Sequence, residues 1–328
     1  MRCAEEKTMS GAEDDKDKAK AGRLSNDPLD GTEPIAPKLT TLNDAMKGGA
    51  EIMFAGKPVN PLRMGFDDLD EGMRRYGPKE VTMLAADSGV GKSTLSTQAA
   101  LHVAACGYGV VYFNLEMPDE MYGLRTGANF AKVSVGKAAA SELETGDINK
   151  MINAFQELSE PAKRIKLGNP REHRTAAAMK ALCAEAKLQL EQEGTPLRLV
   201  VVDHVLQVLV PVKSNDKDGQ GQARADLMKE IAEEFGVHVL ALIHITRDGS
   251  KSGKMPTKND LAGSAWFDRH ADNIFIFHQK RNLDGTFVKN IPATLSVQKC
   301  RWGSPFAIEL EYMGGFFFPW ALGKREAI

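Results

Sequence analysis

The stretch from Ala85 to Thr94, AADSGVGKST, combines glycines, a lysine and hydroxyl side chains. It lies between the apolar segment EVTMLAA and a helix-forming segment. Backbone N–H groups in such a loop turn toward phosphate, and the start of the helix adds positive potential. The lysine would reach the β- and γ-phosphates of a nucleotide, and the serine after it would bind Mg²⁺. The predicted nucleotide-binding residues are Ser88, Gly89, Val90, Gly91, Lys92, Ser93 and Thr94.

Ala86 departs from the usual form of this loop, which has glycine at its first position. That glycine mainly gives room at the turn, whereas the later positions hold the phosphate. Alanine costs little there if its φ is negative. We therefore predict a working nucleotide site.

Two carboxylates follow apolar strands. Asp203 ends the run LVVVD, where a P-loop enzyme places a second oxygen ligand for Mg²⁺. Glu116 ends the segment FNLE, where a carboxylate could accept a proton from an attacking water. Other interpretations remain open, because an Asp after a strand is often a turn former, and Glu116 could instead stabilise the helix that begins near Pro118.

Three further polar positions have roles that the residues alone leave open. His244 ends the apolar run LIH and could sense a γ-phosphate, although a lone histidine is more often solvated or structurally satisfied. Lys299 and Arg301 alternate in VQKCRWG. An arginine can neutralise charge on a transferring phosphoryl group, often in a neighbouring subunit, but both cations could also form a solvated strand edge.

The segment from Arg247 to Asp260, RDGSKSGKMPTKND, is basic and contains glycine and serine. These features suit a loop that binds a phosphate backbone. They equally suit an ordinary solvated loop.

The elements that must position these residues alternate between strands and helices. Strands are predicted at 80–86, 109–116, 164–168, 197–210, 237–246, 273–279, 293–302 and 306–312. Helices are predicted at 92–107, 118–132, 147–158, 175–194 and 223–236. This pattern predicts an α/β fold with a mostly parallel central sheet, helices on both faces and late strands that are partly antiparallel.

Composition narrows the class of protein. The 328 residues, 42% of them hydrophobic, suit one large domain with a tail. A net charge of −2 gives no global basic field, although a local basic loop can still bind nucleic acid. The scattered cysteines predict reduced thiols rather than disulfides or a zinc site. With no signal sequence or membrane-spanning run, we expect a cytoplasmic protein of a bacterium or a phage-infected cell.

The chain divides into three predicted regions. Residues 1–37 are charged and poor in apolar side chains, which predicts a disordered tail. Residues 38–60 are predicted to be a linker with a short helix between Leu39 and Gly49. Residues 61–328 contain the nucleotide-binding domain.

In this order, the segments resemble the RecA-like hexameric replicative helicases: DnaB-type helicases, phage primase–helicases and the mitochondrial Twinkle helicase. The resemblance runs from about Met64 to Tyr312 and is carried by GFDDLDEGM, SGVGKST, NLEM, LVVVDH, LIHITRDG, DLAGSAWFDRHADNIFIFHQKRN and VQKCRWG. Each segment alone is weak, whereas six or seven in register are specific. The resemblance implies that residues 61–328 form a RecA-like P-loop ATPase and helicase domain.

The resemblance also implies a role for each matching residue, including His244 and Arg301, whose roles the residues alone left open. The implied set is Lys92 for phosphate, Ser93 and Asp203 for Mg²⁺, Glu116 as the base, His244 as γ-phosphate sensor, Lys299 and Arg301 as cations that reach a neighbour's ATP site, Arg281 and Tyr312 beside the nucleotide base, and Lys251, Lys254 and Lys258 as DNA contacts.

The implied function is that of an ATP-dependent DNA helicase. Hydrolysis of Mg²⁺-ATP between the subunits of a homo-oligomeric, hexameric ring would drive movement along single-stranded DNA. Primase, loader and polymerase are candidate partners on separate chains, because only about 60 mostly polar residues precede the motor. Two alternatives stay open: a RepA-like or RadA-like ATPase of plasmid or phage replication or recombination, and a non-hydrolysing, ATP-sensing DNA-binding module. Kinases and GTPases fit poorly, since no NKxD-type guanine reader is present.

Overall fold

The computed structural model describes residues 41–54, 62–213, 216–246, 255–261, 264–280 and 292–322. The chain divides into two parts, of which the second, Lys57–Ile328, contains the large domain. The first part contains helix α1 (Leu42–Phe54), which begins later and ends later than the predicted helix from Leu39 to Gly49. The predicted disordered tail, residues 1–37, lies outside the described residues.

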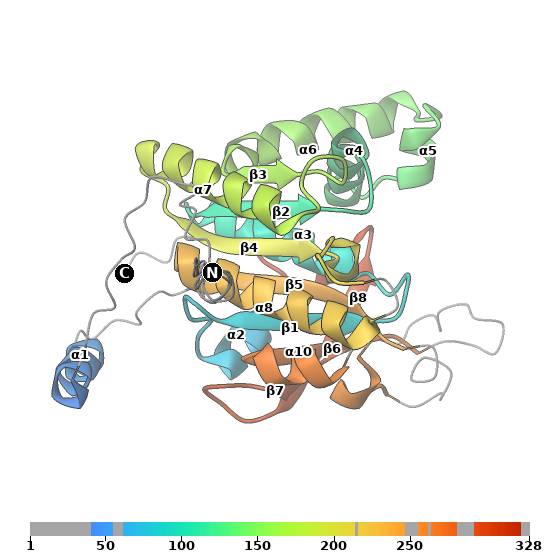
Figure 1. The fold of residues 1–328 in the computed structure, drawn as a ribbon. Helices are drawn as coiled ribbons and strands as arrows, with labels where there is room; N and C mark the ends of the chain where they lie inside the picture. Colours follow the sequence, from blue (N-terminus) through green and yellow to red (C-terminus); the bar gives the residue numbers. More distant parts are fainter. Residues whose placement is uncertain are drawn as a thin grey trace, which may run out of the picture. The chain divides into compact units, whose positions relative to one another are not determined.

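A nine-stranded sheet forms the centre of the large domain (Figure 1), in the order β3-β2-β4-β5-β1-β6-β7-β8-β9. The strands from β3 to β6 are parallel, and β7, β8 and β9 continue the sheet as antiparallel neighbours. The strands are β1 (Val81–Ala86), β2 (Gly109–Asn114), β3 (Ile165–Gly168), β4 (Leu197–Asp203), β5 (His238–His244), β6 (Asn273–His278), β7 (Ala293–Lys299), β8 (Phe306–Met313) and β9 (Phe316–Phe318). The predicted mixture of parallel and late antiparallel strands is confirmed.

Strand β1 lies between β5 and β6 and is buried along its whole length. In its parallel register with these neighbours, Ala86 pairs with His244 of β5 and with Phe277 of β6. The carboxyl ends of the central parallel strands therefore meet at one edge of the sheet, which is where open α/β sheets bind ligands.

Helices cover both faces of the sheet (Figure 1). Apolar residues of α7, α8 and α10 pack with β1, β2, β4 and β5 in one core cluster. Residues of α2 and α3 pack with the other face in a second cluster. The helices are α2 (Asp67–Met73), α3 (Lys92–Ala105), α4 (Asp119–Phe130), α5 (Val135–Ala139), α6 (Thr145–Lys163), α7 (Ala176–Gln192), α8 (Lys217–Phe235) and α10 (Ser264–His270), with short 3-10 turns η1 (Val205–Gln207) and η2 (Lys258–Asp260).

The C-terminal hairpin of β8 and β9 is joined to α3 by a buried amide. Gln98 of α3 donates a hydrogen bond to the carbonyl of Phe317 and accepts one from its backbone N–H, each at 2.9 Å. These two bonds continue the edge of β9 as another strand would, so the last strand is fixed against the helix that follows the phosphate loop.

Two predicted boundaries are wrong in the structure. The strand predicted to run to residue 210 ends at Asp203, because the backbone turns into η1 although the sequence stays apolar. The helix predicted at 147–158 extends over Thr145–Lys163 and includes Pro161 in its last turn. Among the described residues, no helix has the length and apolar content needed to cross a bilayer.

Candidate active site

The phosphate loop connects the end of β1 to the start of α3, as predicted. Gly89 and Gly91 have positive φ values of 79° and 110°, a backbone conformation that favours glycine. A Cβ atom on Gly91 would lie 2.7 Å from the ring of Phe317 in β9. Both the conformation and the space at Gly91 therefore require glycine.

Ala86 is accommodated without backbone strain. It is the last residue of β1, it is fully buried, and its φ is not positive. Its carbonyl accepts hydrogen bonds from the Lys92 ammonium at 2.9 Å and from the backbone N–H of Ile245 at 3.3 Å. Because a strand residue with negative φ tolerates a methyl side chain, the absent glycine is no obstacle to this loop.

The Lys92 side chain lies at the centre of the site. Besides Ala86, its Nζ contacts the carbonyl of Asp87 at 3.2 Å and Nδ1 of His244 at 3.2 Å. Burial lowers the pKa of Lys92 to about 8, against the opposing effect of Asp203 and Glu116. An ammonium group removed from water in this way gains strongly from a phosphate anion.

Asp203 and Ser93 supply oxygen atoms beside the loop. The Asp203 carboxylate is buried at the end of β4, and it accepts a hydrogen bond from the Tyr112 hydroxyl at 3.2 Å. Burial raises the pKa of Asp203, whereas the hydroxyls of Ser93 and Tyr112 oppose that rise by hydrogen bonding. Hydroxyl and carboxylate oxygens are ligands that Mg²⁺ prefers, so this pair fits the predicted metal-binding role.

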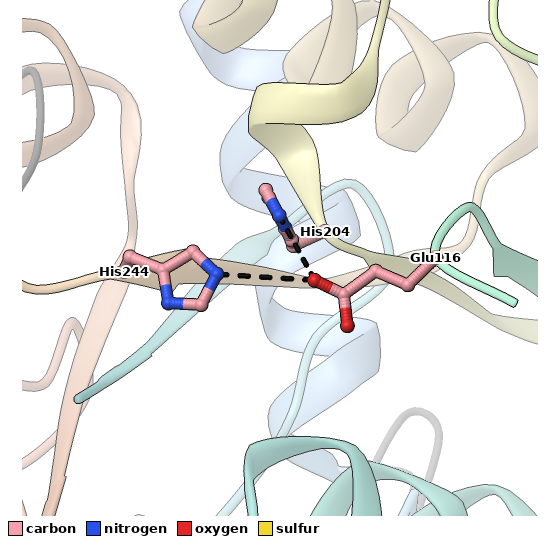
Figure 2. Close-up of side chains that lie close together, drawn as sticks. All are labelled: Glu116, His204 and His244. Atoms are coloured by element: carbon pink, nitrogen blue, oxygen red, sulfur yellow. Dashed lines mark ion pairs between the residues drawn. The ribbon is translucent and has the colours of Figure 1, made fainter. Parts of the chain in front are cut away.

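Glu116 lies between two histidines that come from different strands (Figure 2). Nε2 of His204, the residue after β4, is 3.0 Å from Oε1 of Glu116. Nε2 of His244, the last residue of β5, is 3.9 Å from the same oxygen. The His204 and His244 rings meet edge to face, with centroids 4.5 Å apart. The N–H groups of His204 and His244 hold the pKa of Glu116 well below its usual range, so the group stays a carboxylate.

The same three residues have the types and spacing of a metal site, since their ligand atoms lie within 4.8 Å of one another. Their outer hydrogen bonds do not suit one. A metal-binding histidine usually donates its other N–H to an acceptor. Here Nδ1 of His204 accepts the Leu206 N–H at 3.2 Å, and Nδ1 of His244 faces the Lys92 ammonium. Each Nε2 therefore carries hydrogen, and the cluster presents N–H donors to a carboxylate.

Arg301 and Lys299 lie away from this group. The Arg301 guanidinium is ion-paired with Asp272, and its backbone N–H is bonded to Asn273 at 3.1 Å. The Asp272 carboxylate also accepts the N–H of Val81, the first residue of β1, at 2.9 Å. With about 3.3 Å per strand residue, this anchor is about 17 Å from the phosphate-loop end of β1. Within the described residues, the phosphate loop and Arg301 thus mark opposite ends of the central strand.

The comparison of this chain with known families agrees with the geometry. Residues 61–317 match the DnaB-like helicase C terminal domain, which is more than half of the chain. The chain belongs to this DnaB-like family. The resemblance inferred from its sequence segments is confirmed.

Two curated relatives of this DnaB-like chain are similar at low identity. The replicative DNA helicase DnaB of Haemophilus influenzae is 26% identical over 266 residues, which cover 79% of this chain and 54% of the relative. DnaB of Buchnera aphidicola subsp. Schizaphis graminum is 24% identical over 235 residues, 69% of this chain and 49% of the relative. The chain spans about half the length of the curated relatives it matches.

Two solved structures share the fold. A separately solved ATPase domain aligns with a TM-score of 0.73 and 21% identity over 85% of this chain and 99% of that chain. A DnaB-like replicative helicase, studied with its interactions with primase, aligns with a TM-score of 0.71 and 20% identity over 86% of this chain and 67% of that chain. These alignments confirm the predicted RecA-like fold.

The remaining predicted residues of the DnaB-like domain fall in different places. Tyr312 of β8 is mostly exposed, and its ring centroid is 5.1 Å from that of Phe317. Lys258 is in η2, where its ammonium pairs with Asp268 at 2.9 Å. Nζ of Lys299 donates to the backbone carbonyl of Asp268 at 2.5 Å. Three predicted residues lie outside the described part of the chain: Lys251, Lys254 and Arg281.

His204 is the residue of the site that the sequence reading did not single out. The segment LVVVDH was recognised for Asp203, and the histidine beside it has the same strand-end position. A titratable side chain directly after a buried strand that ends at an active-site edge is the signal that could have found it.

Proposed function

We propose that this domain hydrolyses Mg²⁺-ATP and is the motor of a ring-shaped replicative helicase that moves along single-stranded DNA. The observation that carries the proposal is the meeting of Lys92, Glu116 and Asp203 at one edge of the sheet, beside the N-terminus of α3. A binding module would need the lysine and the loop, whereas two separately placed carboxylates serve hydrolysis.

In this proposal the loop from Ser88 to Thr94 binds the phosphates of ATP through its backbone N–H groups, and Lys92 neutralises the β- and γ-phosphates. Ser93 and Asp203 would hold Mg²⁺, which supplies charge neutralisation on the phosphate oxygens. Glu116 stays ionised and orients the attacking water by accepting its hydrogen bond. His244 contacts both Lys92 and Glu116, so it can respond to a change at the γ-phosphate.

The position of Arg301 supports a site shared between subunits. It is anchored at the far end of β1 from the phosphate loop, so it does not reach the ATP site of its own chain. A neighbouring copy in a ring can bring Arg301 and Lys299 to that site, where an arginine stabilises charge on the transferring phosphoryl group. Exposed apolar residues on α1 and α6 offer surfaces for such contacts: Leu42, Met46, Met53, Phe54, Ile148, Ile152 and Phe155.

The proposed DNA-binding residues are Lys251, Lys254 and Lys258, and Arg281 and Tyr312 are proposed to flank the nucleotide base. Lys258 would have to leave Asp268 to contact DNA, since the two are ion-paired in this structure. By analogy with the helicase studied together with primase, a primase on a separate chain is a candidate partner, as are a loader and a polymerase. Such a protein would act in the cytoplasm.

The test is ATP hydrolysis with and without single-stranded DNA, combined with strand displacement on a forked duplex. We expect DNA-stimulated hydrolysis by the wild type, loss of it in Lys92→Ala and Arg301→Ala, and unwinding of the fork. Intact hydrolysis in both variants would refute the assignment. Strand exchange on a filament without fork unwinding would instead indicate a recombination ATPase, and ATP binding without turnover would indicate a sensing module.

A further inference from the structure

We propose that His204 is a positioning residue for the catalytic carboxylate: it fixes one oxygen of Glu116 so that the other faces the attacking water. This inference rests on the proposed ATP hydrolysis. It adds a residue that the sequence reading did not assign, and it gives that residue a task distinct from binding nucleotide.

The contact between the two side chains is direct. Nε2 of His204 lies 3.0 Å from Oε1 of Glu116, whereas His244 approaches that oxygen only to 3.9 Å. The His204 side chain is buried, and that of Glu116 is about one-third exposed at 36%. A buried donor that holds a partly exposed carboxylate restricts its rotation without excluding water from it.

The hydrogen on His204 is placed by the backbone that follows it. The Leu206 N–H points at Nδ1 of His204 at 3.2 Å, so Nδ1 is an acceptor and the hydrogen is on Nε2, facing Glu116. The backbone of Leu115 also donates to the carbonyl of Asp203 at 2.8 Å. The chain on both sides of the contact is thereby held in register, and the donor points at the carboxylate before any ligand arrives.

The segment after His204 is itself fixed. Arg174 donates to the carbonyl and to the side-chain oxygen of Gln207, at 2.8 and 2.9 Å. Arg224 donates to the carbonyl of Val208 at 3.0 Å. The amide that sets the orientation of the His204 ring therefore belongs to an anchored turn, as expected for an outer partner that orients a catalytic group.

Three substitutions at His204 separate its two hydrogen bonds. The amide nitrogen of glutamine can take the place of Nε2 and keep the bond to Glu116. The side-chain oxygen of asparagine can take the place of Nδ1 and keep only the bond from Leu206. Leucine keeps neither. Comparison of His204→Gln, His204→Asn and His204→Leu therefore tests the contact with Glu116 with fold and volume partly matched.

We expect His204→Asn and His204→Leu to lower kcat for ATP hydrolysis about 30-fold or more, because a misplaced catalytic group costs up to about 100-fold in rate. His204→Gln should recover kcat to within about threefold of the wild type, and KM for ATP should change by less than about threefold in all three. Wild-type kcat in His204→Leu, or a loss in His204→Gln as large as in His204→Leu, would overturn the proposal, as would a change confined to KM.

A second measurement tests the contact without hydrolysis. The midpoint of thermal unfolding is measured for Glu116→Gln, His204→Leu and the double variant. We expect the double variant to lose less than the sum of the single losses, because the two residues share one interaction. Additive losses would overturn the proposal. If the wild type failed to hydrolyse ATP, the proposed function would fail by itself, while the unfolding cycle would still decide whether His204 holds Glu116.

Discussion

Arg301 is ion-paired with Asp272, and the same carboxylate accepts the backbone N–H of Val81 and a bond from Lys229 at 3.3 Å. The arginine that we propose to act on a neighbouring subunit is thus fixed to the central strand of its own subunit. Its side chain is half exposed, whereas that of Asp272 is buried. The carboxylate therefore holds a cation at the surface without covering it.

Asp272→Asn should uncouple this arrangement, because asparagine retains an acceptor for Val81 but not the charge that holds Arg301. We expect kcat for ATP hydrolysis to fall about tenfold with little change in ATP affinity, as for a lost transition-state contact. The matched control is Asp268→Asn, which removes the carboxylate partner of Lys258 and leaves the Arg301 pair intact. Equal kcat values in the two variants would contradict a specific role for Asp272.

Mixed subunits test whether Arg301 acts in a neighbouring site. Lys92→Ala and Arg301→Ala should each be inactive alone, because one lacks the phosphate lysine and the other lacks the arginine. In an equimolar mixture, about a quarter of the interfaces of a ring combine an intact Lys92 with an intact Arg301. We expect ATP hydrolysis to return to about that fraction of the wild-type rate. No recovery after mixing and reassembly would show that the arginine does not act across the interface.

Substitutions in the phosphate loop should differ sharply with position. Ala86→Gly should change the affinity for ATP by less than about threefold, because Ala86 already has an unstrained strand conformation. Gly91→Ala should weaken ATP binding at least about tenfold, since it forces a Cβ against Phe317 at a φ of 110°. Equilibrium titration with a fluorescent ATP analogue measures both. A large gain of affinity in Ala86→Gly would mean that this turn is strained.

Asp70 should make stability depend on pH. Its carboxylate accepts the N–H groups of Met64 and Gly65 at 2.8 and 2.9 Å, but burial dominates and raises its pKa from 3.8 to about 6. The neutral acid is therefore favoured in the folded state. Its stabilising contribution is complete below about pH 4 and is lost as the pH rises through 6, a change of about 3 kcal/mol.

The measurement for Asp70 is the free energy of unfolding by denaturant between pH 4 and 7.5, compared with Asp70→Asn. The asparagine variant is expected to be less stable at pH 4, since its NH₂ group faces one of the two backbone donors. The difference between the proteins should shrink as the pH rises through 6. A difference that stays constant or widens with pH would contradict the assignment.

Most of the framework of the domain was predictable because it depends on local patterns. Buried parallel strands such as β4 read as continuous apolar runs, and the helices between them end at glycines such as Gly236. The end of β4 was missed because Val205 and Val208 are also buried, so the apolar pattern continues where the backbone turns. Burial, rather than the strand itself, sets that pattern.

The site was predictable only in part, since its contacts join residues that are far apart in sequence. Lys92 and Asp203 follow from motifs with known roles. The pairing of His204 with Glu116, and of Arg301 with Asp272, depends on which strands become neighbours and in which register. No local pattern encodes strand order, so the partner of each charged group had to come from the fold.

The hairpin of β8 and β9 has a consequence for the order in which the protein can be made. Gly91 lies against the ring of Phe317, and Phe317 is held by Gln98, 219 residues earlier in the chain. A nascent chain emerging from the ribosome has the complete phosphate-loop sequence long before it has this last strand. We therefore expect ribosome-bound intermediates to form much of the parallel sheet and yet to capture ATP only once β9 has emerged.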